Sequence, residues 1–339
     1  MNTEKRNAKT KNDVQLAETI NKAFITIKKE LSKVIIGQDD IIEQLLISLF
    51  ARGHCLLIGV PGLAKTLLIR TLGEILDLKF SRIQFTPDLM PSDITGTEIL
   101  EEDRSTGQKG FKFIKGPIFA NIILADEINR TPPKTQSALL EAMQEYHVTA
   151  AGQSFNLDPP FFVLATQNPI EQEGTYPLPE AQLDRFMFSL WLDYPTYEQE
   201  VEIVKQTTVD LDIMLDPVLN KNDILEFQNL IRRVPVAENV IDYTVKLVSA
   251  SRSGSQWADA KINEWIRWGA GPRASQYLIL GAKVRSILHN RYTPEIEDID
   301  YLALPVLRHR IAPSYSAEAE GIDVKQIVNY ITDNIINKR

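Results

Sequence analysis

The chain has 339 residues, and its 44% hydrophobic and 24% charged content are ordinary for a globular protein of two domains or one large one. Its formal net charge of −8 gives no support to non-specific attraction to nucleic acid, so a nucleic-acid partner is not expected. Apolar runs fall far short of the ~20 residues of a membrane span, residues 1–13 lack a signal-peptide core, and the single Cys55 excludes an intramolecular disulfide, so the cytoplasm is the expected location.

The first part of the chain predicts two helices and a strand. Residues 1–13 are polar and are expected to form a flexible tail, whereas apolar positions recur at helical spacing over residues 14–33. Gly37 ends that pattern, and Asp39 and Asp40 favour the start of a second helix over residues 39–51. The apolar run 55–58 then predicts a buried strand, and residues 67–76 a helix.

The middle of the chain alternates predicted strands with helical or irregular segments. Strands are expected at residues 80–85, 120–124, 161–165 and 186–190, and an amphipathic helix at 134–146. Residues 148–157 predict a hairpin that turns at Ala151-Gly152. Residues 86–115 are expected to be irregular and polar, with 111–114 as a candidate arm of a hairpin.

Strands separated by helices indicate a parallel sheet with helices on both faces. After residue 197 the strand signal fades, and helices are expected at 197–207, 222–232, 238–252, 273–289, 295–310 and 323–336. The chain therefore predicts an α/β core over residues 1–195 and an all-α second domain over 196–339, with Pro195 as the hinge.

A candidate phosphate-binding loop lies between the first strand and the following helix. Gly59 opens the pattern and Lys65 and Thr66 close it, but Ala64 stands where a second glycine is expected. Backbone N–H groups can still cradle phosphates if Ala64 has a negative φ, with Lys65 on the phosphates and Thr66 on Mg²⁺. The expected nucleotide-binding residues of this segment are Gly59, Val60, Pro61, Gly62, Leu63, Ala64, Lys65, Thr66 and Leu67.

An acidic pair follows the strand at 120–124. Asp126 is expected to hold Mg²⁺ together with Thr66, and Glu127 to polarise the water that attacks the γ-phosphate. Asn168, after the next buried strand, could contact the γ-phosphate or that water, or it could be a turn residue before Pro169.

Two arginines are candidates for neutralising charge on the transferred phosphate. Arg185 precedes a strand and could be supplied to a neighbouring subunit, and Arg273 begins a helix of the second domain and could reach the phosphate in cis. Arg130, just after Glu127, is a weaker candidate. The alternative for each of the three is a surface ion pair.

Four motifs together resemble the MoxR family of AAA+ ATPases. These motifs are Gly-Val-Pro-Gly-Leu-Ala-Lys-Thr at 59–66, Ala-Asp-Glu-Ile-Asn-Arg at 125–130, Ala-Thr-Gln-Asn-Pro at 165–169 and Leu-Pro-Glu-Ala-Gln-Leu-Asp-Arg-Phe at 178–186. The resemblance covers residues 34–311 and implies a P-loop AAA+ core with a C-terminal all-α lid domain. The family itself has alanine at the position of Ala64.

The resemblance also implies roles for individual residues. It implies that ATP and Mg²⁺ bind at the subunit boundaries of a hexameric ring. Lys65 and Thr66 then match the Walker A residues, Asp126 the magnesium-side acid and Glu127 the catalytic glutamate. Asn168 matches sensor 1, Arg273 matches sensor 2 on the lid and Arg185 matches a trans-acting arginine finger. Gly37 and Gln38 match the segment near adenine, and Arg130 is expected near the subunit boundary.

At the level of the family, the resemblance implies a chaperone-like machine. The chain is similar to ATPases that are partners of von Willebrand A domain proteins. Such ATPases are linked to metal or cofactor insertion and to the maturation of complexes. This chain has no Asp-x-Ser-x-Ser motif, so a partner would supply that domain. Residues 86–116 and 148–157 resemble pore-side inserts of the clade that includes magnesium chelatase subunits. An ATP-gated binding scaffold with incidental turnover stays open as an alternative, and a nucleic-acid translocase is a weaker one.

Overall fold

The computed structural model describes residues 2–102, 109–150, 152–170, 174–210 and 213–335, and side chains from residue 12 to residue 334 within these ranges. Its centre is a five-stranded sheet in the order β2-β5-β8-β1-β9, in which every neighbouring pair is parallel. The strands are β1 (Cys55–Gly59), β2 (Phe80–Gln84), β5 (Ile122–Asp126), β8 (Phe162–Gln167) and β9 (Phe188–Leu192). All five predicted strands and the parallel sheet are confirmed.

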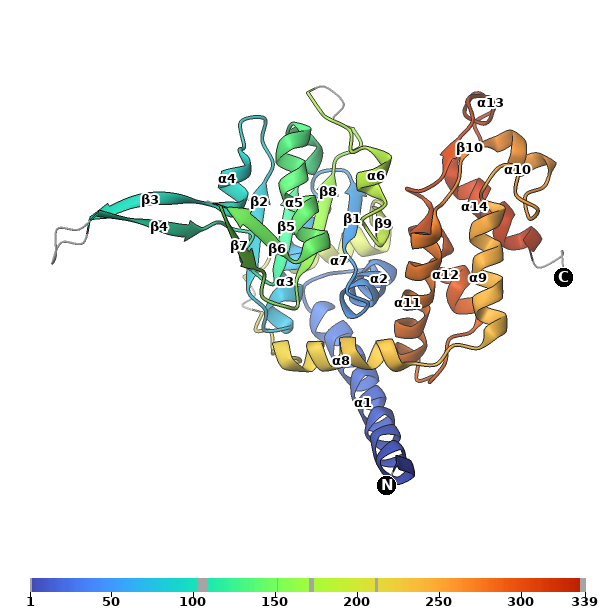
Figure 1. Ribbon diagram of the computed structural model, residues 1–339, viewed down its shortest axis with the longest axis horizontal. Coiled ribbons are helices and arrows are strands. Elements are labelled where there is room, and N and C mark those ends of the chain that lie inside the picture. The colour runs from blue at the N-terminus through green and yellow to red at the C-terminus, as the bar shows by residue number, and fades with distance from the viewer. Residues whose placement is uncertain (1, 103–108, 151, 171–173, 211–212, 336–339) are drawn as a thin grey trace.

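Helices cover both faces of this sheet because its strands are apolar on both sides (Figure 1). Successive side chains of a strand point to opposite faces, so Cys55 and Leu57 of β1 join one buried cluster and Leu56 joins the other. The first cluster contains residues of α1 (Asn2–Leu31), α2 (Asp39–Phe50) and α3 (Lys65–Ile75). The second contains residues of α4 (Pro91–Thr95) and α5 (Pro133–Glu145).

Helix α1 begins much earlier than the pattern predicted. It starts at Asn2 rather than near residue 14, so the segment expected to be a flexible tail is helical from Asn2 onward. The sequence did not predict a helix over residues 1–13 because this segment is polar, and apolar residues at helical spacing begin only at residue 14. Gln38 precedes α2, with Asp39 and Asp40 in its first turn as expected.

Two hairpins leave the core between β2 and β8. Strands β3 (Gly96–Glu102) and β4 (Lys109–Lys115) form a long antiparallel pair that projects from the body of the molecule (Figure 1). Strands β6 (His147–Ala150) and β7 (Gln153–Asn156) form the predicted second hairpin, whose turn residue Ala151 lies outside the described residues.

The expectation of an irregular segment over residues 86–115 is therefore wrong in part. It holds helix α4 and strand β3, and only the arm containing residues 111–114 was anticipated. Cross-strand contacts, such as the Lys112–Glu101 ion pair at 2.9 Å, stabilise these exposed strands. Because both faces carry charged residues, the strands show no simple apolar alternation.

The six helices predicted after residue 197 are confirmed. They are α7 (Tyr197–Thr207), α8 (Lys221–Arg233), α9 (Glu238–Ala250), α11 (Pro272–Leu288), α12 (Ile296–Leu307) and α14 (Val324–Ile335). The structure adds four short elements that the sequence did not predict: α10 (Ala260–Trp265), α13 (Tyr315–Ala319) and the antiparallel pair β10 (Ile266–Trp268) and β11 (Ala312–Pro313). Helices α9 to α14 lie beside the core beyond β9, and α8 runs beneath it (Figure 1).

Helix α8 packs on α1 and α2 of the core as well as on α11 of the C-terminal part. The domain boundary at residue 195 therefore stays a prediction. The short α6 (Glu180–Leu183) and a 3₁₀ turn, Ile128–Arg130, complete the described elements. Within the described part of the chain, no helix is both long enough and apolar enough to cross a membrane.

His54 ties the start of β1 to the neighbouring elements of the core. It is 3% exposed, its Nδ1 accepts a hydrogen bond from the Val163 N–H at 3.1 Å, and its Nε2 donates to the Met143 carbonyl at 3.1 Å. Burial lowers the pKa of His54 to about 4, although the bond to Met143 opposes this shift. The imidazole is therefore neutral in the folded chain at pH 5, where an exposed histidine is protonated.

This lowered pKa makes folding stability fall as pH drops below 6.5, because His54 binds a proton in the unfolded chain at a pH at which it stays neutral in the folded chain. Between pH 7 and pH 5, wild type should lose about 2 kcal/mol more unfolding free energy than His54→Gln, as measured by urea unfolding. Equal pH dependence in the two proteins would show that His54 titrates normally in the folded chain.

Candidate active site

The phosphate loop joins β1 to α3 at the carboxyl edge of the sheet. Strand β1 ends at Gly59, and α3 begins at Lys65, so the amide groups of the first turn of α3 have no partners within the helix. The loop is largely open to solvent, and Thr66 is exposed. The Lys65 ammonium donates a hydrogen bond to the Gly59 carbonyl at 2.5 Å and so lies across the loop. This arrangement is suited to binding a polyphosphate.

The condition set for this loop, a negative φ at Ala64, is not met. Its φ of 53° and ψ of 24° place it in the left-handed region, immediately before the first residue of α3. An L-residue in this region carries roughly 1–2 kcal/mol of strain, which explains why the general pattern has glycine here. The loop therefore keeps its conformation in spite of the methyl group, at the expense of local strain.

The carboxylate of Asp126, at the end of β5, accepts hydrogen bonds from two side chains. Asp126 is 9% exposed, its Oδ1 accepts from the Thr166 hydroxyl at 2.6 Å, and its Oδ2 accepts from the Arg82 guanidinium at 2.6 Å. Only β8 separates β5 from β1, so these two strands lie about 10 Å apart across the sheet, and Asp126 is level with Leu57, two residues before Gly59. Carboxylate and hydroxyl oxygens are the donors that Mg²⁺ prefers, so Asp126 and Thr66 fit that ion. Arg82 shares Oδ2 and would compete with such an ion.

Glu127 lies in the left-handed region with φ 57°, which turns it out of the line of β5. Its N–H donates to the Thr166 hydroxyl oxygen at 2.9 Å. Its carboxylate Oε2 accepts hydrogen bonds from Gln84 Nε2 at 3.0 Å and from Arg130 Nη1 at 2.9 Å. These two donors hold the Glu127 carboxylate in this conformation.

Several of these partners were missed by sequence reasoning. Arg82 and Gln84 belong to no recognised motif, and Thr166 lies in the motif at 165–169 but was given no role; the pairing of β2 and β8 with β5 brings all three to the acidic pair. Arg130 forms an ion pair with Glu127, which was the alternative considered for it. Asn168 is 6% exposed, and its Oδ1 accepts from the Ile170 N–H at 3.2 Å, so it also serves the turn.

A cavity of about 410 Å³ is lined by Leu192, which pairs in register with Gly59 at the start of the phosphate loop. Gln38 also lines this cavity. Among the described residues, the buried Oε1 of Gln38 has no hydrogen-bond partner, which leaves an acceptor for the amino group of a base. Gly37 has φ 73°, and a side chain there would come within 2.6 Å of Gln199. The expected position of Gly37 and Gln38 beside a base is compatible with this cavity.

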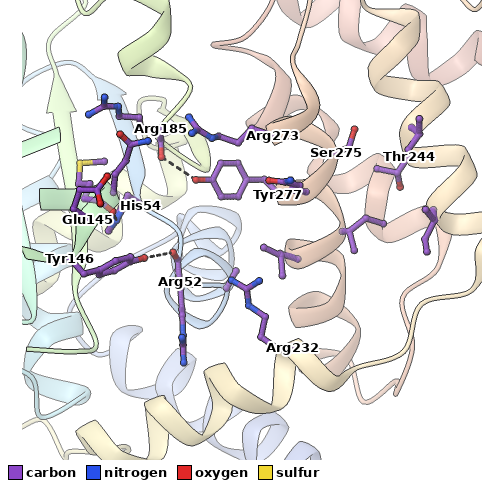
Figure 2. Close-up of a pocket in the computed structure, with 18 residues that line it drawn as sticks. Arg52, His54, Glu145, Tyr146, Arg185, Arg232, Thr244, Arg273, Ser275 and Tyr277 are labelled. Carbon is purple, nitrogen blue, oxygen red and sulfur yellow. Dashed lines mark hydrogen bonds between the residues drawn. The ribbon is translucent and has the colours of Figure 1, made fainter. Parts of the chain in front are cut away.

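Arg185 and Arg273 lie together at the other edge of the sheet. Arg185 lies three residues before β9 and donates to the Leu140 carbonyl at 2.8 Å, and Arg273 pairs with Asp184 at 3.1 Å. Both line a cavity of about 770 Å³ between the core and the C-terminal helices, together with His54 and Tyr146. Figure 2 shows the two guanidinium groups at the same end of this cavity.

The expectation that Arg273 reaches the phosphate of its own chain is therefore corrected. Its partner Asp184 stands at the amino ends of the strands, whereas the phosphate loop stands at their carboxyl ends. The sequence placed Arg273 at the start of a helix but could not show toward which edge of the sheet that helix points.

Comparison with known proteins agrees with this geometry. Residues 54–188 match the model of the ATPase family associated with various cellular activities (AAA), and residues 259–331 match the AAA lid domain. The chain is 42% identical to chaperone MoxR1 of Mycobacterium tuberculosis, over 90% of this chain and 80% of that protein. It is also 42% identical to the uncharacterized protein YeaC of Bacillus subtilis, over 89% and 91%.

A solved structure shows the same fold. The putative ATPase from Cytophaga hutchinsonii superposes with a TM-score of 0.88 at 44% identity, over 95% of this chain and 97% of that one. A phosphate loop, an acidic strand end and a helical lid define an ATPase of the AAA class. The chain belongs to the MoxR family of AAA+ ATPases.

The strained backbone at Ala64 can be tested directly. Ala64→Gly should raise the unfolding free energy by up to about 1 kcal/mol, because it releases the strain but gives the unfolded chain more freedom. Ala138→Gly in α5 is the matched control and should lower that energy by about 1 kcal/mol. Urea unfolding checks both variants, and a clear loss of stability in Ala64→Gly would contradict the left-handed conformation.

Proposed function

We propose that the chain hydrolyses ATP with Mg²⁺ at a site shared between two copies, and that this hydrolysis drives the remodelling of protein clients. The observation that carries the proposal is the position of the two halves of the site. The phosphate loop and acidic pair lie at one edge of the sheet, and Arg185 and Arg273 lie at the other. One chain cannot close both halves around one nucleotide, and a neighbour in a ring can.

The chain's own residues supply binding and base catalysis in this proposal. The loop amides and Lys65 would hold the phosphates, and Thr66 and Asp126 would hold Mg²⁺, which would supply positive charge to the phosphates. Glu127 orients and deprotonates the attacking water once Gln84 and Arg130 release its carboxylate. Asn168 lies between these groups at the end of β8 and contacts the same water or phosphate.

The neighbouring copy supplies positive charge for the transition state. Arg185 is the arginine finger in this proposal, and Arg273 accompanies it from the same side rather than from the lid of the nucleotide-binding chain. The ring is proposed to be a hexamer, as the family resemblance implies, and the protein to act in the cytoplasm.

A chaperone-like role is supported by the relative named chaperone MoxR1 and by one exposed feature of this chain. On the β3–β4 hairpin, Leu100 and Phe111 are directly opposite each other and are 58% and 76% exposed. Paired apolar side chains on a projecting hairpin are suited to binding protein clients. We extend the proposal to a von Willebrand A domain partner and to metal or cofactor insertion on the family resemblance alone.

The alternative is an ATP-gated scaffold with incidental turnover. The observation that favours it is the restraint on Glu127, whose carboxylate is engaged by Gln84 and Arg130. Turnover measured with and without a client separates the two functions, because a remodelling enzyme accelerates when a client is bound.

Two substitutions separate binding from hydrolysis. Lys65→Ala should abolish nucleotide binding, because it removes the cation from the phosphate loop. Glu127→Gln should bind ATP normally and lose turnover by about 10²-fold or more, because an amide cannot accept the proton. Calorimetry and phosphate release measure the two properties, and wild-type turnover in Glu127→Gln would remove this residue from the role of base.

A mixing experiment tests the shared site. Arg185→Ala should lower turnover by about 10³-fold with nucleotide binding retained. Added Lys65→Ala subunits should restore activity, since they bring an intact Arg185 to a neighbour that still binds ATP. If the mixture stays as inactive as its components, Arg185 does not act between subunits.

A further inference from the structure

The turn that carries Arg185 is contacted by several side chains of the C-terminal helical part. The Tyr277 hydroxyl donates to the Arg185 carbonyl at 3.2 Å, and His309 Nε2 donates to the Phe186 carbonyl at 3.0 Å. Figure 2 shows Tyr277 reaching across the cavity to Arg185. Neither contact involves the Arg185 guanidinium, which lines the cavity and donates through Nη1 to the Leu140 carbonyl.

Arg310 makes the largest contribution to this turn. It follows α12, its side chain is 2% exposed, and its Nε donates to Asp184 Oδ1 at 2.7 Å. Its Nη2 donates to the carbonyls of Asp184 at 2.9 Å and Phe186 at 2.7 Å, and its Nη1 to those of Met187 at 3.3 Å and Val306 at 2.5 Å. The five N–H donors of the guanidinium thus have five acceptors, four of them on residues 184–187.

The other carboxylate oxygen of Asp184 accepts a hydrogen bond from Arg273. Two arginines of the helical part, Arg273 and Arg310, therefore bind this carboxylate. Burial lowers the pKa of His309 well below its usual value, with the Arg310 charge adding to the effect. His309 is therefore neutral and can donate through Nε2 only in one tautomer. These contacts fix the backbone on both sides of Arg185. The core also holds this turn, through the bond from Arg185 to the Leu140 carbonyl and through the Met187 N–H, which donates to the His54 carbonyl at 2.7 Å.

A trans-acting arginine is effective only when its guanidinium is placed accurately, and a displacement of about 1 Å can lower a rate by about 10²-fold. We propose that Arg310 is a positioning residue for Arg185: it couples the placement of the helical lid to the arginine that each chain presents to its neighbour. This inference rests on the proposed function of Arg185 in trans. It assigns to the lid an effect on the adjacent subunit's nucleotide.

The test places one substitution on either side of a defined interface. The parent mixture contains Lys65→Ala subunits, which supply Arg185 but bind no nucleotide, and Arg185→Ala subunits, which bind ATP but supply no finger. Arg310→Met is then added either to the Lys65→Ala subunits or to the Arg185→Ala subunits. Phosphate release from each mixture is measured at saturating ATP, with assembly checked by light scattering.

Arg310→Met in the subunit that supplies the finger should lower the restored activity by at least about tenfold. The same substitution in the Arg185→Ala subunit should change it by less than about twofold, because that turn no longer carries the finger. Arg285→Met is the control for loss of a buried arginine: Arg285 is 13% exposed and bonds Asp298, not the turn. In the finger-supplying subunit it should leave activity within about twofold of the parent mixture.

Tyr277→Phe is the milder variant, which keeps the fold and removes only the hydroxyl bond to the Arg185 carbonyl. It should lower activity by about threefold on the finger side and leave it unchanged on the other side. Equal losses on both sides would reduce Arg310 to a structural role, and no loss on either side would overturn the proposal. Absence of activity in the parent mixture would overturn the trans function of Arg185 itself, and with it this inference.

Discussion

The two edges of the parallel sheet carry different functional groups, and the distance between these edges is the constraint on which the proposed active site depends. Every strand ends at the edge that carries the phosphate loop and Asp126, and begins at the edge that carries Arg185. Strand β9 has five residues and spans about 17 Å, which is beyond the reach of an arginine side chain. A nucleotide at one edge therefore cannot meet the arginine of the same chain, and assembly becomes part of the proposed chemistry rather than an addition to it.

Each edge is also restrained by contacts that would have to change during turnover. At the carboxyl edge, Glu127 is held by Gln84 and Arg130, and Arg82 shares an oxygen of Asp126 with any bound cation. At the amino edge, the lid holds the turn that carries Arg185 through Arg310. The proposed mechanism thus links three moving parts: release of the base, entry of the cation and placement of the arginine by the lid.

The sequence predicted what local pattern controls. Buried strands such as β1 and β8, the phosphate loop and the helices after residue 197 all follow from apolar periodicity and turn chemistry. What it missed depends on distant pairing. Gln84 reaches Glu127 only because β2 pairs with β5, and Arg310 reaches the finger turn only because α12 packs against β9. The left-handed φ of Ala64 was not predicted for another reason, because alanine rarely adopts this conformation.

The central claim is that one chain holds only half of a working site. The most direct measurement is specific ATPase activity over a dilution series, with the mass of the particles determined at each concentration. Turnover per chain is expected to fall in proportion to the loss of assembled particles, while ATP binding by the dissociated chain persists. Constant turnover per chain down to concentrations at which only monomers remain would contradict it.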